Sequence, residues 1–244
     1  MQNDQEWAEA ERQRSPRARR AFTALLVLLA AMFLALGTWQ VQRLFWKLDL
    51  IARVDARVHA EPVAAPTGAI DPAEDDYRHV TATGLFDHDK TVLVQAVTER
   101  GSGFWVVTPL RADDAPTILV NRGFVPADRS ARDTRLGSEL AAGPVTVTGL
   151  LRISEPGGGF LRANDPAGVR WYSRDVAAIA AAKGVANVAP YFIDADATKN
   201  PGGLPIGGLT VVAFRNSHLV YALTWYAMAA GLAGALIYVR RRAP

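Results

Sequence analysis

The chain of 244 residues contains no cysteine. This absence excludes disulfide bonds, thiolate metal centres, CxxC redox sites and thiol nucleophiles, and with them copper chaperones and thiol oxidoreductases. Only four histidines remain as soft metal ligands. The chain also lacks the G-x-S-x-G, GxxxxGK[ST], H-E-x-x-H and G-x-G-x-x-G signatures of common enzyme classes. We therefore expect a protein that is not an enzyme.

Two apolar runs without any charged residue lie near the ends of the chain, at 21–42 and 219–239, and no third run lies between them. At a rise of about 1.5 Å per residue, each reaches roughly 30 Å, the thickness of the hydrocarbon core of a bilayer. The sequence therefore predicts two transmembrane helices that flank one domain. The predicted order is a basic tail (1–20), a first span (21–42), an α+β domain (43–217), a second span (218–239) and a second basic tail (240–244).

Basic residues flank the two runs on their outer ends. They are Arg12, Arg14, Arg17, Arg19 and Arg20 before the first run, and Arg240, Arg241 and Arg242 after the second. These clusters outnumber Arg43 and Lys47, so the positive-inside rule places both termini in the cytoplasm. We expect a protein of the bacterial inner (plasma) membrane with a periplasmic central domain. Because the charge gathers at membrane boundaries and not on a folded face, no nucleic acid is expected as a partner.

The first run has an alternative interpretation as a cleaved signal peptide, with Ala35-Leu36-Gly37 as the cleavage site. A run of about 22 residues exceeds the usual apolar region of roughly 7–15 residues in signal peptides. Trp39 also lies where an aromatic anchor at the membrane interface is expected. These two features favour a span.

The central domain has the pattern of an α+β fold with a mostly antiparallel sheet. Apolar residues at spacings of three and four extend the first helix through 44–58, and prolines and acids predict a linker at 64–76. A helix is expected at 174–183, where Asp175 and Gly184 are suitable end residues. Strands are predicted from β-forming residues between turn signals at 77–86, 90–99, 104–111, 117–124, 145–153, 188–193 and 209–214.

Three groups in this domain could carry chemistry, and each has a plainer interpretation. The residues His79, Asp87, His88 and Asp89 could form a metal or acid/base group, or could simply be surface residues. Arg122 follows a buried-strand pattern and could bind a carboxylate or propionate, or form a structural ion pair. The glycines at 157–159 are better explained as a turn than as a phosphate-binding loop.

His218 lies at the outer edge of the second span. Tyr221, Ala222 and Trp225 follow it at i+3, i+4 and i+7, which places all four on one helical face. Trp39 and Gln40 are expected at a similar depth in the first span. If the two spans pack together, these side chains form a flat apolar slot in which the His218 imidazole could bind haem iron. The alternative is an interfacial histidine.

Five sets of residues occur in a fixed order along the chain and resemble the Surfeit locus protein family of cytochrome oxidase assembly factors. The similarity covers the chain from Leu36 to Tyr226, although Phe124 stands where the family often has tryptophan. The sets are Gly37, Trp39-Gln40, Arg43 and Trp46-Lys47; Tyr77-Arg78-His79-Val80, Gly84 and Phe86; Val120-Asn121-Arg122-Gly123 and Val125-Pro126; Asn164, Trp171-Tyr172 and Asp175; and Asn216, His218-Leu219, Tyr221-Ala222 and Thr224-Trp225-Tyr226.

This resemblance implies a non-catalytic helper in the biogenesis of a haem-copper terminal oxidase. The implied step is the delivery of haem a to the large oxidase subunit, with haem a synthase as a further partner and the lipid bilayer around the spans. By the same resemblance, His218 is the expected haem ligand, and no other metal site is implied. The alternative is a periplasmic ligand-binding sensor or enzyme that the two spans merely anchor.

Overall fold

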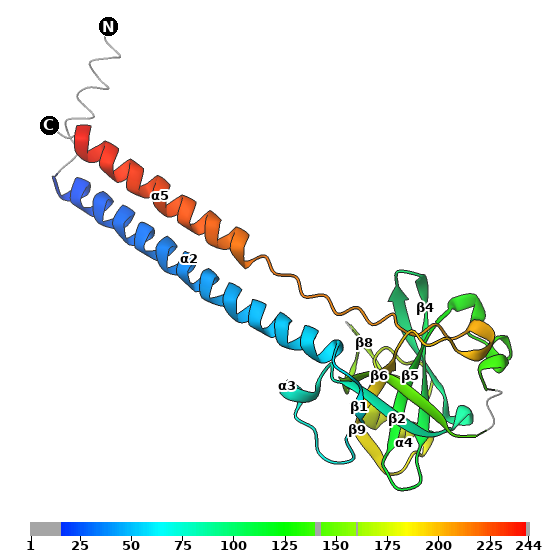
Figure 1. Ribbon diagram of the computed structural model, residues 1–244. Coiled ribbons are helices and arrows are strands. Elements are labelled where there is room, and N and C mark those ends of the chain that lie inside the picture. Colours follow the sequence, from blue (N-terminus) through cyan, green and yellow to red (C-terminus); the bar gives the residue numbers. More distant parts are fainter. Residues whose placement is uncertain (1–15, 140–142, 160, 243–244) are drawn as a thin grey trace. The chain divides into compact units, whose positions relative to one another are not determined.

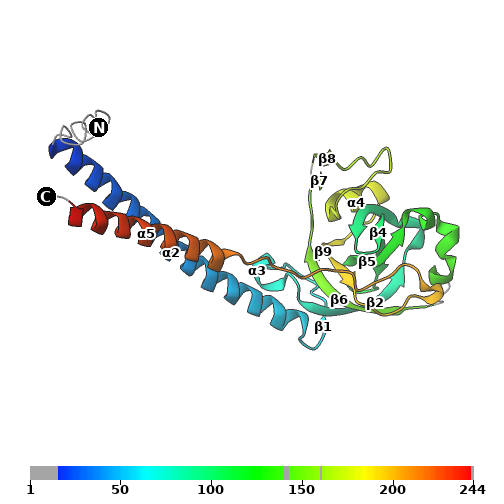
Figure 2. The same cartoon turned by 90° about the horizontal axis from the view of Figure 1, so that it is seen from above.

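The computed structural model describes residues 16–139, 143–159 and 161–242. The chain forms two compact units. The helix pair contains the residues up to Ala52 together with those from Ala213 onward, and the sheet domain contains Arg53–Val212. Figures 1 and 2 show the elements of both units.

The helix pair is formed by α5 (His218–Arg242) and by α2 (Pro16–Val58), whose last residues, from Arg53 onward, belong to the sheet domain. Both helices are long and apolar enough to cross a membrane. Only 6% and 11% of their most apolar windows are buried, unlike the core helices of soluble proteins, so these apolar surfaces are available to lipid. The predicted continuation of the first span through 44–58 is confirmed, because α2 runs unbroken to Val58.

The sheet domain is built on a seven-stranded sheet in the order β1-β2-β6-β9-β5-β4-β3. An additional pairing of β2 with β4 closes β2, β6, β9, β5 and β4 into a small barrel. Most pairs are antiparallel, as predicted, and β1–β2 and β5–β9 are parallel. The strands are β1 (Val63–Ala64), β2 (His79–Phe86), β3 (Val92–Thr98), β4 (Gly101–Arg111), β5 (Thr117–Pro126), β6 (Val145–Ile153), β7 (Gly158–Gly159), β8 (Arg162–Ala163) and β9 (Val188–Ala195).

Shorter helices complete the sheet domain. The α-helix α4 (Val176–Lys183) has the end residues that the sequence predicts: the side chain of its N-cap Asp175 accepts a hydrogen bond from the Ala178 backbone N–H, and its C-cap Gly184 has a φ of 59°. The others are α3 (Pro72–Asp75) and the 3₁₀ helices η1 (His88–Lys90), η2 (Ala127–Arg129), η3 (Arg132–Glu139) and η4 (Pro201–Gly203).

The sheet domain has two apolar cores. One packs side chains of the barrel strands, and its buried members are Val80, Leu110, Ile118, Val120, Leu151, Ala189, Tyr191 and Ile193. The other contacts α4, and its buried members are Val92, Val94, Val107, Leu119, Trp171, Val176, Ile179 and Phe192. Alternate residues of β5 and β9 therefore enter opposite cores, which explains the unbroken apolar runs at 118–120 and 191–193.

Three details of the sequence prediction need correction. The strand predicted at 209–214 is wrong: these residues form no ladder, and Val211 is 78% exposed, because apolar composition without a pairing partner does not make a strand. The predicted linker at 64–76 contains the end of β1 and the helix α3, whose first turn is capped by the Asp71 side chain. The glycines predicted as a turn include β7, which pairs with β8.

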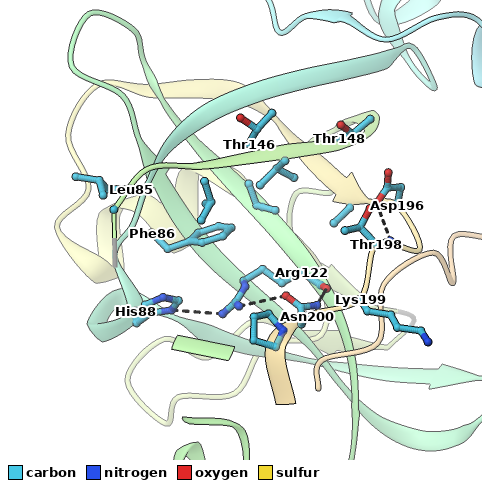
Figure 3. Close-up of a pocket in the computed structure, with 16 residues that line it drawn as sticks. Leu85, Phe86, His88, Arg122, Thr146, Thr148, Asp196, Thr198, Lys199 and Asn200 are labelled. Carbon is cyan, nitrogen blue, oxygen red and sulfur yellow. Dashed lines mark hydrogen bonds between the residues drawn. The ribbon is translucent and has the colours of Figure 1, made fainter. Parts of the chain in front are cut away.

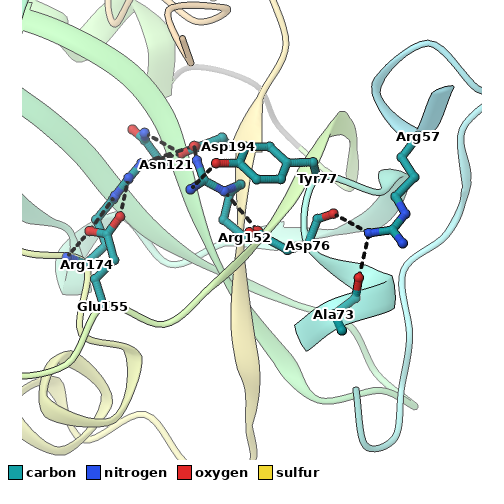
Figure 4. A network of polar contacts seen from close by, with 9 residues as sticks. All are labelled: Arg57, Ala73, Asp76, Tyr77, Asn121, Arg152, Glu155, Arg174 and Asp194. Atoms are coloured by element: carbon teal, nitrogen blue, oxygen red, sulfur yellow. Dashed lines mark hydrogen bonds and ion pairs between the residues drawn. The ribbon is translucent and has the colours of Figure 1, made fainter. Parts of the chain in front are cut away.

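A buried network of charged side chains ties β9 to its neighbours (Figure 4). Asp194, only 2% exposed, accepts hydrogen bonds from Asn121 (2.7 Å), Arg174 (2.8 Å) and Arg152 (3.3 Å). Arg174 also forms an ion pair with Glu155 at 2.5 Å. Burial by itself would raise the pKa of Glu155, but hydrogen bonds and charge from Arg174 outweigh it and hold that pKa below its usual value. Asp194 thus lies between two guanidinium groups, each of which has a second carboxylate partner: Asp76 for Arg152, at 3.1 Å, and Glu155 for Arg174.

Candidate functional site

The helix pair packs along a seam of partly buried side chains at heptad-like spacing. On α2 they are Leu26, Ala30, Phe33, Gly37, Gln40, Leu44 and Lys47, and on α5 they are His218, Ala222, Trp225, Ala229, Leu232 and Leu236. The rings of Phe33 and Trp225 lie 5.5 Å apart, and the hydroxyls of Thr38 and Tyr226 lie 3.2 Å apart. The two spans therefore pack against each other, as the sequence hypothesis required.

His218 is the first residue of α5, and its imidazole faces α2. Its Nδ1 lies 2.7 Å from Oε1 of Gln40. An amide oxygen can only accept a hydrogen bond, so Nδ1 is the donor in this contact, and Nε2 is the nitrogen that carries the lone pair in the neutral imidazole. Histidines that bind a metal are typically oriented in this way, by a hydrogen bond from the other ring nitrogen. Nε2 of His218 is thus suited to bind a haem iron, and Gln40 is the residue that fixes the tautomer of the ring.

The other predicted members of the haem slot take different positions. Trp225 contacts Phe33, and Ala222 is buried in the seam. Trp39 and Tyr221 have 50% and 55% of their surfaces exposed, so they lie outside the packed seam. They could contact a flat apolar ligand or lipid at that depth.

A second candidate site lies in the sheet domain, at the mouth of the barrel (Figure 3). Arg122 on β5 is only 4% exposed, and its guanidinium lies over the Phe86 ring at 4.7 Å. It contacts His88 Nδ1 at 3.3 Å and donates to Asn200 Oδ1 at 3.2 Å. Burial lowers the pKa of Arg122 to about 10, so the group stays charged at pH 7. Burial and the Arg122 charge also lower the pKa of His88, which leaves its imidazole neutral and able to accept from Arg122.

Comparisons with known proteins find a family match over most of the chain. The SURF1 family model matches residues 27–230. Surfeit locus protein 1 of Mus musculus is 40% identical over 221 residues, covering 84% of this chain and 71% of the relative. The chain belongs to the SURF1 family. Surfeit locus protein 1 of Homo sapiens is 40% identical over 223 residues, covering 84% of this chain and 73% of the relative. The SURF1-like protein of Monosiga brevicollis is 36% identical over 241 residues, covering 93% of this chain and 90% of the relative.

The SURF1 family match encloses both candidate sites, with Gln40 and His218 in one and Arg122 in the other. The remaining sequence candidates are not brought together. His79 Nδ1 contacts the Ala60 carbonyl, Asp87 lies 3.8 Å from Arg111, and Asp89 pairs with Arg132. Among the described residues, no group of three or more metal-ligating side chains is found.

Sequence reasoning missed the network around Asp194, although a signal was present. The predicted strand 188–193 is followed at once by an acid, and arginines at positions 152 and 174 lie at the ends of neighbouring predicted elements. The pattern alone does not show that β9 continues through the buried Asp194, where these two arginines meet.

Gly37 sets how closely the two spans of this SURF1 family member approach. A Cβ added at Gly37 would lie 2.7 Å from the ring of Tyr226, whereas one added at Gly231 of α5 would meet nothing within 4 Å. We expect Gly37→Val to separate the helices at this level, because overpacking costs about 1–3 kcal/mol. Since the chain has no cysteine, cross-linking between Phe33→Cys and Trp225→Cys measures the separation. The yield should fall several-fold with Gly37→Val and stay unchanged with Gly231→Val; equal yields would contradict the packing.

Proposed function

We propose that this protein assists the assembly of a haem-copper terminal (cytochrome c) oxidase by holding haem a for transfer to the large oxidase subunit. The SURF1 family is known for cytochrome c oxidase assembly factors, and membership supports the general role. The observation that carries the finer proposal is the Gln40–His218 hydrogen bond, which leaves one imidazole nitrogen for iron.

In this proposal haem a is cargo, and the protein acts without catalysis. Bound haem would supply an iron centre that an imidazole can ligate. His218 Nε2 binds the iron, Gln40 holds the ring orientation, and the half-exposed Trp39 and Tyr221 with the nearby Trp225 offer an apolar surface to the macrocycle. Haem a synthase is the proposed source of the cargo.

The positive-inside pattern supports the proposed orientation, with both termini in the cytoplasm and the sheet domain on the periplasmic side of a bacterial inner membrane. The described part of that pattern is the group Arg17, Arg19 and Arg20 at the start of α2 and Arg240, Arg241 and Arg242 at the end of α5. Arg12 and Arg14 lie outside the described residues.

Gene deletion tests the proposed function in cells. We expect deletion to reduce the haem a absorbance of isolated membranes while the oxidase subunits are still synthesised, as judged by immunoblotting. The intact gene should restore the signal. Unchanged haem a spectra in the deletion strain would remove the proposal and favour an anchored sensor or enzyme.

A further inference from the structure

The barrel mouth contains a pocket of about 280 Å³ whose lining includes no residue of the proposed haem site. At roughly 30 Å³ per water molecule, this space holds about nine waters, so it suits one small molecule. Its apolar walls come from four barrel strands and the segment after β9. They are Leu85, Phe86, Val120, Val145, Val147, Ala195 and Pro201.

Two cations and one acid lie among the polar residues that line this pocket. Arg122 lies within the apolar mouth, whereas Lys199 is exposed. The acid, Asp196, accepts a hydrogen bond from the Thr198 backbone N–H. Glu139, which acts on Arg122 electrostatically, is ion-paired with Arg132 at 2.8 Å. The pocket thus has a cationic end and an apolar wall.

Two contacts of Arg122 in the pocket can be exchanged for those of an anion. The distances to His88 and Asn200, 3.3 and 3.2 Å, are longer than the roughly 2.7–2.9 Å of a charge-assisted bond, and these two side chains are neutral. A guanidinium fork matches a carboxylate in geometry and charge. Figure 3 shows Thr146 and Thr148 of β6 on the opposite side of the pocket from Arg122.

We propose that the barrel mouth binds a small monocarboxylate with an apolar tail. Arg122 holds the carboxylate, Lys199 attracts it at the entrance, and the tail packs against Phe86 and the valines of the pocket wall. The apolar lining favours a monocarboxylate over inorganic phosphate, whose whole surface is polar. This inference concerns the sheet domain alone and does not depend on haem binding by His218.

Calorimetric titration of the full chain in lipid nanodiscs tests the proposal, with empty nanodiscs titrated in parallel. The probes are hexanoate, hexan-1-ol, which keeps the chain without the charge, and inorganic phosphate. We expect saturable binding of hexanoate that is at least about tenfold tighter than that of either control, because a charge-assisted hydrogen bond is worth about that factor or more. Binding of hexan-1-ol or phosphate as tight as that of hexanoate would overturn the proposal, as would the absence of hexanoate binding.

Variants assign the binding to the pocket. Arg122→Gln should weaken hexanoate binding about tenfold or more. Because Arg122 is buried, Lys199→Ala provides a second variant at an exposed position, and it should weaken binding several-fold. Arg100→Ala, an exposed arginine outside the pocket lining, is the matched control and should bind like the unaltered chain. If Lys199→Ala binds hexanoate as tightly as this control, the proposed entrance is wrong and the proposal falls.

Discussion

Replacing Asp194 by alanine is expected to lower the free energy of unfolding of the sheet domain by about 3 kcal/mol, because it removes a buried carboxylate that two guanidinium groups and the Asn121 amide share. Arg174 and Arg152 both donate to this carboxylate, and their side chains are only 14% and 16% exposed. A loss of this size is a large fraction of the roughly 5–15 kcal/mol that stabilises a typical domain. Urea denaturation of the protein in detergent micelles measures it.

Two further variants distinguish the loss of the buried Asp194 carboxylate from the loss of an exposed acidic side chain. Asp89 has a side chain that is 84% exposed and pairs with Arg132, so Asp89→Ala should change the urea midpoint very little. Asp194→Asn keeps the shape of the side chain and a hydrogen bond to one donor, so its urea midpoint should lie between those of Asp194→Ala and Asp89→Ala. Equal midpoints for Asp194→Ala and Asp89→Ala would show that the network does not stabilise the domain.

The parts of the fold that depend on local sequence could be predicted. The two spans follow from long uncharged runs, and the end of α4 follows from Gly184, whose φ of 59° favours glycine. Strand positions follow from alternation and turn residues. The closure of the barrel could not be predicted, because the pairing of Leu85 with Arg111 and of Phe86 with Leu110 joins residues far apart in sequence.

The candidate sites likewise contain some contacts that could be predicted from the sequence and others that could not. The proximity of Gln40 and His218 was expected from their similar depth in two adjacent spans, and the hydrogen bond between them confirms that contact. For Arg122, the sequence left a ligand and an ion pair open, since the neighbours of a strand end depend on the whole barrel. The residue after Arg122 must be glycine for a separate reason: Gly123 has a φ of 131°, and a Cβ there would overlap the Ile206 carbonyl.

Replacing His218 by alanine is expected to have the largest effect on haem binding, because it removes the proposed iron ligand. Gln40→Leu keeps the ligand but removes the hydrogen bond that fixes its tautomer, and changes of this kind typically weaken metal binding by about 10–100-fold. His218→Ala should therefore weaken binding more than Gln40→Leu does. His59→Ala, at a histidine whose side chain is 73% exposed, is the matched control and should bind haem normally.

The visible absorption spectrum of the protein purified from membranes that contain haem a tests the central claim most directly, because bound haem reports the ligation of its iron. The unaltered chain and His59→Ala should show a haem spectrum with imidazole ligation, and His218→Ala should lose it. A spectrum without haem from the unaltered chain, or the same haem spectrum from His218→Ala, would contradict the account.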